Sequence, residues 1–441
     1  AMKRTVHALL LAAFASLGAA SLTAQDTATA PSVEIPATDE GLPGAGPIRR
    51  YDWFKNLWRK KRSGWAKRVQ EDQEAIVFLG DSITQGWGDT MGGSFPGMKV
   101  ANRGISGDTT RGMLIRLKED VLALQPSAVV LLMGTNDLEE GATPEVIAGN
   151  LKLIVAGLKA HDPTMPIVLC KVFPSSARKK RPADQVKKIN ELYAAAVVGD
   201  PQVTVMETWL LFADENGDAR KAEFPDLLHP NKAGYAKWAA TLRPIFATLG
   251  YLETERDAFK LEEGFESLFN GRDLTGWGYR ANANTKRKPS PSRPVWKKDH
   301  SFDGKKQSID GRYAAVNGRL VVITPPAGRR FQQIWTTREF SRDFVLKLEF
   351  RATAFADSGV FIRKPQLQCR DFLLAGPWKE LKNYKPQEWN ELVVTVKGNV
   401  AHCTCNGEVL DAAMKVPDSG PIGLEGDRGQ MEYRRIRIKE M

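Results

Sequence analysis

The hydrophobic pattern of this 441-residue chain changes its period near Thr254, and this change constrains the fold more than any other feature. Between about Tyr51 and Leu249, short apolar runs alternate with amphipathic stretches long enough to form helices. That alternation is typical of βαβ units and a parallel sheet covered on both faces. After Thr254, short strand-like runs are separated by Gly, Asn and Asp, which predicts an all-β sandwich. The sequence therefore predicts two domains of different class.

The first domain is predicted to be α/β, with strands and helices in alternation. The strands are expected at Ala75–Leu79, Lys99–Asn102, Ala128–Met133, Ile167–Val172 and Val203–Met206. The helices are expected at Thr110–Leu124, Thr143–Ala160, Pro182–Val198 and Lys232–Leu249. Because ligands bind at the carboxyl ends of the strands in such sheets, the loops after these strands are expected to surround one site.

The second domain is predicted to consist of strands joined by tight turns. The strands are expected at Arg319–Ile323, Phe344–Phe350, Glu391–Val396, Val400–Cys405 and Tyr433–Ile438. Asn406-Gly407, between two of them, is a hairpin signal. We place the first domain at 51–250, an interdomain linker at 251–262 and the β-sandwich at 263–441.

The N-terminal residues 1–24 have the pattern of a cleaved secretory signal peptide. A basic start is followed by an apolar run from Ala8 to Ala20 and by small residues up to Ala24. A membrane anchor would need about 18–20 consecutive apolar residues. We therefore expect a secreted or periplasmic protein without a stable membrane anchor. Residues 25–50 are rich in Ala, Thr, Pro and Gly and are predicted to be a flexible linker.

The composition narrows the class of partner without naming one. Lys and Arg number 63 against 52 Asp and Glu, and this excess favours anionic polysaccharide, a membrane surface or nucleic acid. The export signal disfavours nucleic acid. Four cysteines do not make a disulfide scaffold, although one disulfide of open connectivity is plausible in an exported protein. The oligomeric state is not readable from the sequence.

Three segments at the expected site carry residues suited to ester hydrolysis. Ser82 stands on the turn between the first strand and a helix, where a hydroxyl can act as a nucleophile. Asn136 follows the third strand and offers an amide donor. Asp226 precedes His229 by three residues, so carboxylate and imidazole can share one side of a turn.

Elimination among the five histidines also favours His229. His7 belongs to the signal peptide and His161 to a charged helix end, while His300 and His402 lie in the other domain. Asp81 and Asp137, which flank the candidate residues, are interpreted as hydrogen-bond acceptors that order loops. No His or Cys pair in this domain has metal-ligand spacing, so neither a metal nor a cofactor is expected.

In these segments the chain resembles the SGNH/GDSL hydrolases, most closely their small acetylhydrolase branch. The Ser, Gly, Asn and His of that family match Ser82, Gly104, Asn136 and His229, in the family's order. The resemblance implies a flavodoxin-like three-layer domain and a serine esterase. It also implies that Ser82 attacks the ester, that His229 transfers the proton and that Asp226 orients the imidazole. Ser82, Gly104 and Asn136 would form the oxyanion hole.

A basic loop after the fourth strand is expected to border the pocket. Its residues Arg178, Lys179, Lys180 and Arg181 are candidates for binding an anionic substrate, with a solvated surface loop as the alternative. The resemblance to acetyl esterases favours a short acyl group on carbohydrate. A lysophospholipase or short-chain lipid esterase is the alternative.

The second domain resembles the 3-keto-disaccharide hydrolase domain, a concanavalin-like jelly roll. The resemblance rests on Gly264–Trp277, Asp357–Arg363 and Gly420–Leu424. Such a domain could bind a glycan and keep the esterase near it, or it could be a second enzyme with Asp357, Glu425 and Asp427 as candidate carboxylates. A glycan-binding protein with an idle hydrolase domain is a further alternative, against which the complete set of site residues argues.

Overall fold

The computed structural model describes residues 32–252, 258–282, 295–323, 332–353, 356–370 and 380–441. The expected signal peptide at 1–24 and the first residues of the expected linker lie outside these ranges. Within them, no helix is both long and apolar enough to cross a membrane.

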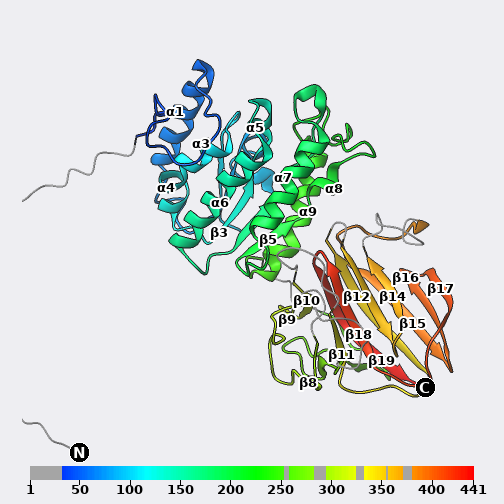
Figure 1. The fold of residues 1–441 in the computed structure, drawn as a ribbon. Coiled ribbons are helices and arrows are strands. Elements are labelled where there is room, and N and C mark those ends of the chain that lie inside the picture. Colours follow the sequence, from blue (N-terminus) through cyan, green and yellow to red (C-terminus); the bar gives the residue numbers. More distant parts are fainter. Residues whose placement is uncertain (1–31, 253–257, 283–294, 324–331, 354–355, 371–379) are drawn as a thin grey trace, which may run out of the picture. The chain divides into compact units, whose positions relative to one another are not determined.

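The N-terminal domain alternates strands and helices (Figure 1). Its strands are β1 (Ile76–Gly80), β2 (Val100–Gly104), β3 (Ala128–Leu132), β4 (Ile167–Cys170) and β5 (Val203–Met206). Its α-helices are α1 (Asp52–Ala66), α2 (Ser82–Gly86), α3 (Thr110–Ile115), α4 (Leu117–Asp120), α5 (Thr135–Glu139), α6 (Pro144–His161), α7 (Ala183–Ala196), α8 (Trp209–Phe212) and α9 (Lys232–Thr248). Three 3-10 turns complete it: η1 (Met91–Gly93), η2 (Leu122–Leu124) and η3 (Ala177–Lys179).

The five strands form one parallel sheet in the order β2-β1-β3-β4-β5. Side chains on one face pack against α3, α4, α6 and α7, and those on the other face pack against α9. The order reverses direction at β1, so the loops after β1, β2 and β3 meet at the same edge. The predicted α/β class is confirmed.

Helix α1 was not expected, and the helix predicted at Thr110–Leu124 is broken into α3, α4 and η2. The break lies at Arg116, whose backbone leaves the helical region and whose side chain is fully buried. Its guanidinium donates to the backbone oxygen of Arg103 at 2.8 Å, beneath the loops of the site. Periodicity alone did not reveal this interruption because the tertiary contacts of one arginine produce it.

The flexible linker expected at 25–50 is wrong for its second half. Ile48 and Arg49 are buried, and the compact part of the chain begins at Val33. Asn150 on α6 exchanges two hydrogen bonds with the backbone of Ala45, and Thr109 donates to the Pro47 oxygen at 2.8 Å. The composition suggested flexibility, but these contacts hold the segment against the domain.

The C-terminal domain is an antiparallel sandwich, as predicted. Its strands are β6 (Glu266–Ser267), β7 (Trp277–Tyr279), β8 (His300–Ser301), β9 (Tyr313–Val316), β10 (Arg319–Val322), β11 (Gln333–Thr336), β12 (Phe344–Ala352), β13 (Asp357–Ile362), β14 (Gln366–Arg370), β15 (Asn390–Lys397), β16 (Val400–Cys405), β17 (Glu408–Lys415), β18 (Ile422–Arg428) and β19 (Met431–Glu440). One sheet has the order β17-β16-β15-β12-β19-β10-β9, with β6 beside β19, and the other has the order β14-β13-β18-β11-β7-β8.

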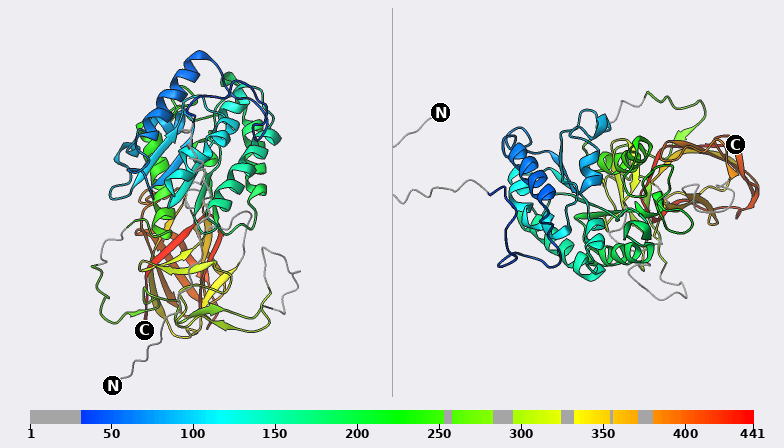
Figure 2. Two further views of the ribbon diagram at one scale, coloured as in Figure 1. Left: turned by 90° about the vertical axis from the view of Figure 1, so that its left-hand side faces the viewer. Right: turned by 90° about the horizontal axis from the view of Figure 1, so that it is seen from above.

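The two sheets face each other (Figure 2), and their buried side chains form one apolar core. Along β12 and β15, buried and partly exposed residues alternate, as expected for strands with one face on the core. Asn406 and Gly407 form the predicted hairpin turn, both with positive φ. None of the four cysteines forms a disulfide; Cys403 and Cys405 are buried in the core instead.

Candidate active site

Ser82 is the first residue of α2, and only Asp81 separates it from the end of β1. Asp81 caps this helix: its Oδ1 accepts the backbone N–H of Ile83 at 2.9 Å. A side chain at Gly80 would lie 2.7 Å from the backbone oxygen of Leu132, so the tight turn requires glycine there. The local sequence Gly-Asp-Ser thus brings the hydroxyl to the carboxyl edge of the sheet.

Asp226 and His229 are joined by a short turn before α9. The Oδ1 atom of Asp226 accepts the backbone N–H groups of Leu228 at 3.0 Å and His229 at 2.7 Å. Leu227 adopts a positive φ of 65°, and its backbone oxygen accepts the Ser175 hydroxyl at 2.8 Å. The three-residue spacing therefore brings the imidazole within hydrogen-bond distance of the carboxylate.

A continuous chain of hydrogen bonds joins the three candidate residues. Nδ1 of His229 lies 2.7 Å from Oδ2 of Asp226, and Nε2 lies 2.9 Å from Oγ of Ser82. Partial burial of Asp226 raises its pKa, but the hydrogen bonds from His229 and Leu228 outweigh this effect and lower the pKa to about 2. The His229 side chain is 45% exposed, so substrate can reach the site from solvent.

Asn136 on α5 is held in one orientation by two partners. Its Nδ2 donates to the backbone oxygen of Asp108 at 2.9 Å, and its Oδ1 accepts from Nη2 of Arg181 at 2.9 Å. Because arginine can only donate, this contact fixes which end of the amide carries the N–H groups. The second N–H of Nδ2 remains available for an oxyanion.

Gly104 does not offer a free N–H. Its backbone N–H donates to Oδ1 of Asn102 at 2.8 Å, and a side chain there would overlap the backbone of Gln85 on α2. The glycine serves this close packing. Gly107, three residues later, has a φ of 87°, and its N–H donates no hydrogen bond within the residues that the structure describes. Gly107 therefore fits the expected oxyanion donor better than Gly104 does.

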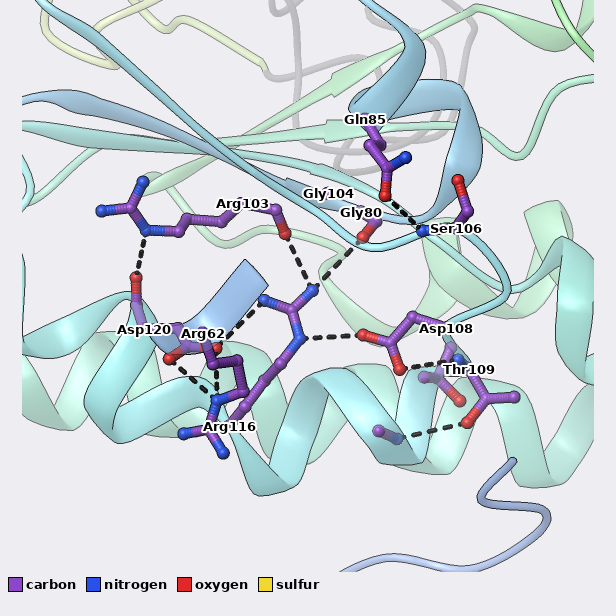
Figure 3. Close-up of polar contacts among 12 residues, drawn as sticks. Arg62, Gly80, Gln85, Arg103, Gly104, Ser106, Asp108, Thr109, Arg116 and Asp120 are labelled. Carbon is purple, nitrogen blue, oxygen red and sulfur yellow. Dashed lines mark hydrogen bonds and ion pairs between the residues drawn. The ribbon is translucent and has the colours of Figure 1, made fainter. Parts of the chain in front are cut away.

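A buried ionic network supports the loop that contains Gly107 (Figure 3). Arg116 donates to Oδ2 of Asp108 at 2.8 Å, and both side chains are fully buried. The backbone N–H of Ser106 donates to Oε1 of Gln85 at 2.8 Å. The loop is thus held by the Arg116–Asp108 ion pair and by the side-chain amide of Gln85 on α2.

Asp81 and Asp137 serve as acceptors within the loops of the site. Asp137 accepts two hydrogen bonds from Thr110, one from the hydroxyl at 2.5 Å and one from the backbone N–H at 3.0 Å. Burial raises the pKa of each of these carboxyls to about 6. Neither belongs to the chain that joins Ser82 to Asp226.

The basic loop divides into one buried and three more accessible residues. Arg178 and Lys180 are exposed and Lys179 is partly exposed, whereas Arg181 is only 2% exposed. Arg181 donates to the backbone oxygen of Thr135 at 2.9 Å and to Glu139 at 2.9 Å, besides Asn136. Direct substrate binding by Arg181 is therefore wrong, because its donors are already used inside the protein.

The structure also brings in residues that the sequence did not reveal. Arg49 donates to Oε1 of Glu140 at 2.6 Å and also pairs with Glu139, the partner of Arg181. A Cβ built on Gly107 would lie 2.9 Å from Nη1 of Arg49. The four-residue spacing from Phe54 to Trp58, both buried, was a helical signal that could have identified α1.

The C-terminal domain has its own polar cluster on β18 and its neighbours. Glu425 is 4% exposed; Gln333 on β11 donates to one of its oxygens and Gln366 on β14 donates to the other at 2.9 Å. Burial, with the nearby Asp427 and Asp357, raises the pKa of Glu425 to about 7. Within the described ranges, no group of three or more His, Cys, Asp or Glu residues is placed to hold a metal ion.

Comparisons with known proteins find a match for a segment of each domain. Residues 78–237 match the model of the GDSL-like lipase/acylhydrolase family, and residues 264–439 match a 3-keto-alpha-glucoside-1,2-lyase-like domain. The human platelet-activating factor acetylhydrolase IB subunit alpha1 is 26% identical over 199 residues, which are 44% of this chain and 84% of that protein. The bovine alpha2 subunit has the same identity and coverage.

Among solved structures, a GDSL-like lipase from Bacteroides thetaiotaomicron has 26% identity and a TM-score of 0.37. The match covers 43% of this chain and 95% of the other. By the two family models, the chain combines a GDSL-like lipase/acylhydrolase domain at 78–237 with a 3-keto-disaccharide hydrolase-like domain at 264–439.

Proposed function

We propose that this protein is an exported serine esterase that removes acetyl or similar short acyl groups from carbohydrate. The observation that carries the proposal is the hydrogen-bonded chain Ser82–His229–Asp226 at the carboxyl edge of the sheet. The carbohydrate assignment is supported by the match of the C-terminal domain to a glucoside-processing family. That domain would bind the glycan and raise the local concentration of its esters.

The geometry suggests a role for each residue. Oγ of Ser82 attacks the ester carbonyl while Nε2 of His229 accepts its proton. The carbonyl oxygen, now negative, accepts hydrogen bonds from the backbone N–H groups of Ser82 and Gly107 and from Nδ2 of Asn136. The tetrahedral intermediate collapses and the sugar hydroxyl leaves with the proton from His229. Water then repeats the sequence on the acyl-enzyme and releases the carboxylic acid.

Throughout this cycle Asp226 remains ionised and stabilises the imidazolium. Because its pKa is about 2, its charge is present at any pH at which the protein is expected to act. Its Oδ2 also fixes the tautomer of His229, so that Nε2 faces the serine as an acceptor.

The test is acetate release from acetylated polysaccharides by the wild type and by Ser82→Ala, with 4-nitrophenyl acetate, butyrate and octanoate beside them. Release that disappears in the variant, with a sharp fall in rate beyond about four acyl carbons, would support the proposal. The relatives are named platelet-activating factor acetylhydrolases, so a lipid ester is the second candidate. Ser82-dependent activity confined to lipid or long-chain esters would favour it, and no Ser82-dependent activity would leave the C-terminal domain as the working part.

A further inference from the structure

Two aromatic rings lie at the start of α1, where they remain open to solvent. Tyr51 and Trp53 are each 52% exposed. Their ring centroids are 6.4 Å apart and their planes differ by only 10°. Since burying such rings favours folding, a pair that stays exposed and parallel is informative about binding.

Trp53 contacts the loop of the active site directly. A Cβ built on Gly107 would lie 2.6 Å from Cη2 of Trp53, so the edge of the indole packs against this glycine. Phe54, which is buried, meets the same ring edge-to-face at 5.6 Å and helps to hold it. The indole is therefore fixed beside the backbone N–H that we assign to the oxyanion hole.

Polar groups border the two rings. The Tyr51 hydroxyl donates to Oε2 of Glu140 at 3.3 Å, and Arg49 donates to the other oxygen of that carboxylate. The indole N–H of Trp53 makes no hydrogen bond in the part of the chain that the structure describes. A sugar ring suits this combination, because its C–H groups can pack on aromatic faces while its hydroxyls need donors and acceptors at the edge. An extended acyl chain would offer no acceptor to the Trp53 indole N–H.

We propose that Trp53 and Tyr51 form a subsite that stacks against the sugar ring bearing the ester. This inference rests on the proposed function of the N-terminal domain and specifies how its substrate is recognised. Both residues lie outside the segment 78–237 that matches the acylhydrolase family. In this proposal, the sugar is recognised by residues at the start of α1 and not by the segment that matches the family.

The experiment compares the wild type, Trp53→Ala, Trp53→Phe and Tyr51→Ala on two kinds of ester. The first is 4-nitrophenyl acetate, which has no sugar. The second is a set of acetylated xylo-, cello- and manno-oligosaccharides. Loss of one aromatic stacking partner is expected to raise KM for the oligosaccharide about three- to tenfold more than KM for 4-nitrophenyl acetate. Trp53→Phe should restore part of the difference. Leu153→Ala, at a 45% exposed apolar residue on α6, is the matched control and should change neither KM.

Unacylated oligosaccharides give a second readout, as inhibitors of 4-nitrophenyl acetate hydrolysis that Trp53→Ala should weaken by a similar factor. Equal losses on both esters, or no loss on either, would overturn the subsite while leaving the esterase assignment intact. Hydrolysis of 4-nitrophenyl acetate that no oligosaccharide inhibits would overturn both the subsite and the carbohydrate assignment.

If no ester is hydrolysed, the proposed function fails separately. Calorimetric binding of oligosaccharide to Ser82→Ala, compared with Ser82→Ala/Trp53→Ala, then decides the subsite: equal affinity overturns it, and weaker binding without Trp53 supports it.

Discussion

Arg181 holds the amide of Asn136 in place: Nη2 of the arginine donates to Oδ1 of the asparagine at 2.9 Å. The guanidinium is 2% exposed, and its other donors bind Thr135, Lys179 and Glu139. With Oδ1 occupied, Nδ2 donates to the Asp108 oxygen, and in the proposed mechanism its second N–H binds the oxyanion. A basic residue that the sequence placed among substrate-binding groups is thus a positioning residue within the protein.

A double-mutant cycle tests this relationship. Asn136→Ala should lower kcat by about 10²–10³, since one oxyanion donor is lost. Arg181→Met should lower kcat by roughly 10–100-fold, in the range observed for outer partners that orient a functional group. If Arg181 acts through Asn136, the double variant will be no slower than Asn136→Ala alone. The measurement is kcat and KM on 4-nitrophenyl acetate, with thermal unfolding as the check on folding.

Independent, multiplicative losses in that cycle would contradict the positioning role. Arg181→Lys should recover little of the rate, because lysine cannot reproduce the fork of donors. Arg178→Ala and Lys180→Ala serve as controls from the same loop and should stay within about twofold of the wild type on neutral esters, because both side chains are exposed. A selective loss on anionic esters in these two controls would support anion binding by the exposed part of the loop.

Asp226→Asn should lower kcat by about 10⁴ with little change in fold, because an amide cannot stabilise the imidazolium and can select the wrong tautomer. The pKa of Asp226, about 2, lies below its ordinary value, so protonation of this carboxylate should not limit activity above about pH 4. The pH profile of kcat/KM from pH 4 to 9 checks both statements. A loss of less than tenfold in the variant would remove Asp226 from the proposed mechanism.

Asp81→Asn should make stability less dependent on pH. Burial raises the pKa of Asp81 to about 6 in the folded state, so the folded protein binds its proton more tightly than the unfolded chain does. Ionisation of Asp81 therefore lowers the free energy of unfolding of the wild type. This loss is absent below about pH 4, grows as the pH rises through 6 and is then constant. It reaches about 3 kcal/mol for a shift of about two pKa units. Urea unfolding of wild type and variant at pH 4, 6 and 8 measures it. An unchanged difference in free energy across these pH values would contradict the prediction.

Arg116→Met should destabilise the N-terminal domain by about 3–5 kcal/mol, because it leaves the buried carboxylate of Asp108 without its cation. Arg116→Met/Asp108→Asn should cost less than the sum of the two single changes, since the unpaired charge is then removed. Urea unfolding gives the free energies. Arg59→Met on the exposed side of α1, where the arginine side chain is 51% exposed, should cost less than about 0.5 kcal/mol. If Arg116→Met also lowers the free energy of unfolding by less than about 0.5 kcal/mol, the Arg116–Asp108 pair does not stabilise the domain.

Sequence patterns predicted the two domain classes because they depend on spacing along the chain. The alternation of apolar and polar residues in Phe344–Phe350, or the spacing from Asp226 to His229, is a local property that survives without knowledge of the fold. The same locality explains why α3–α4 was predicted as one helix. Arg116 interrupts that helix through contacts with residues that the pattern does not contain.

The sequence by itself determined the parallel α/β and antiparallel β architectures, and it predicted Ser82, Asn136, Asp226 and His229 as candidate site residues. Only the tertiary structure decided that the Gly104 N–H is used by Asn102, that Arg181 faces inward to Asn136, and that residues 33–50 pack against the domain. The physical reason is that a donor's partner depends on which distant segments meet it after folding. Residue type and spacing specify what a side chain can do, whereas burial and non-local hydrogen bonds specify what it does.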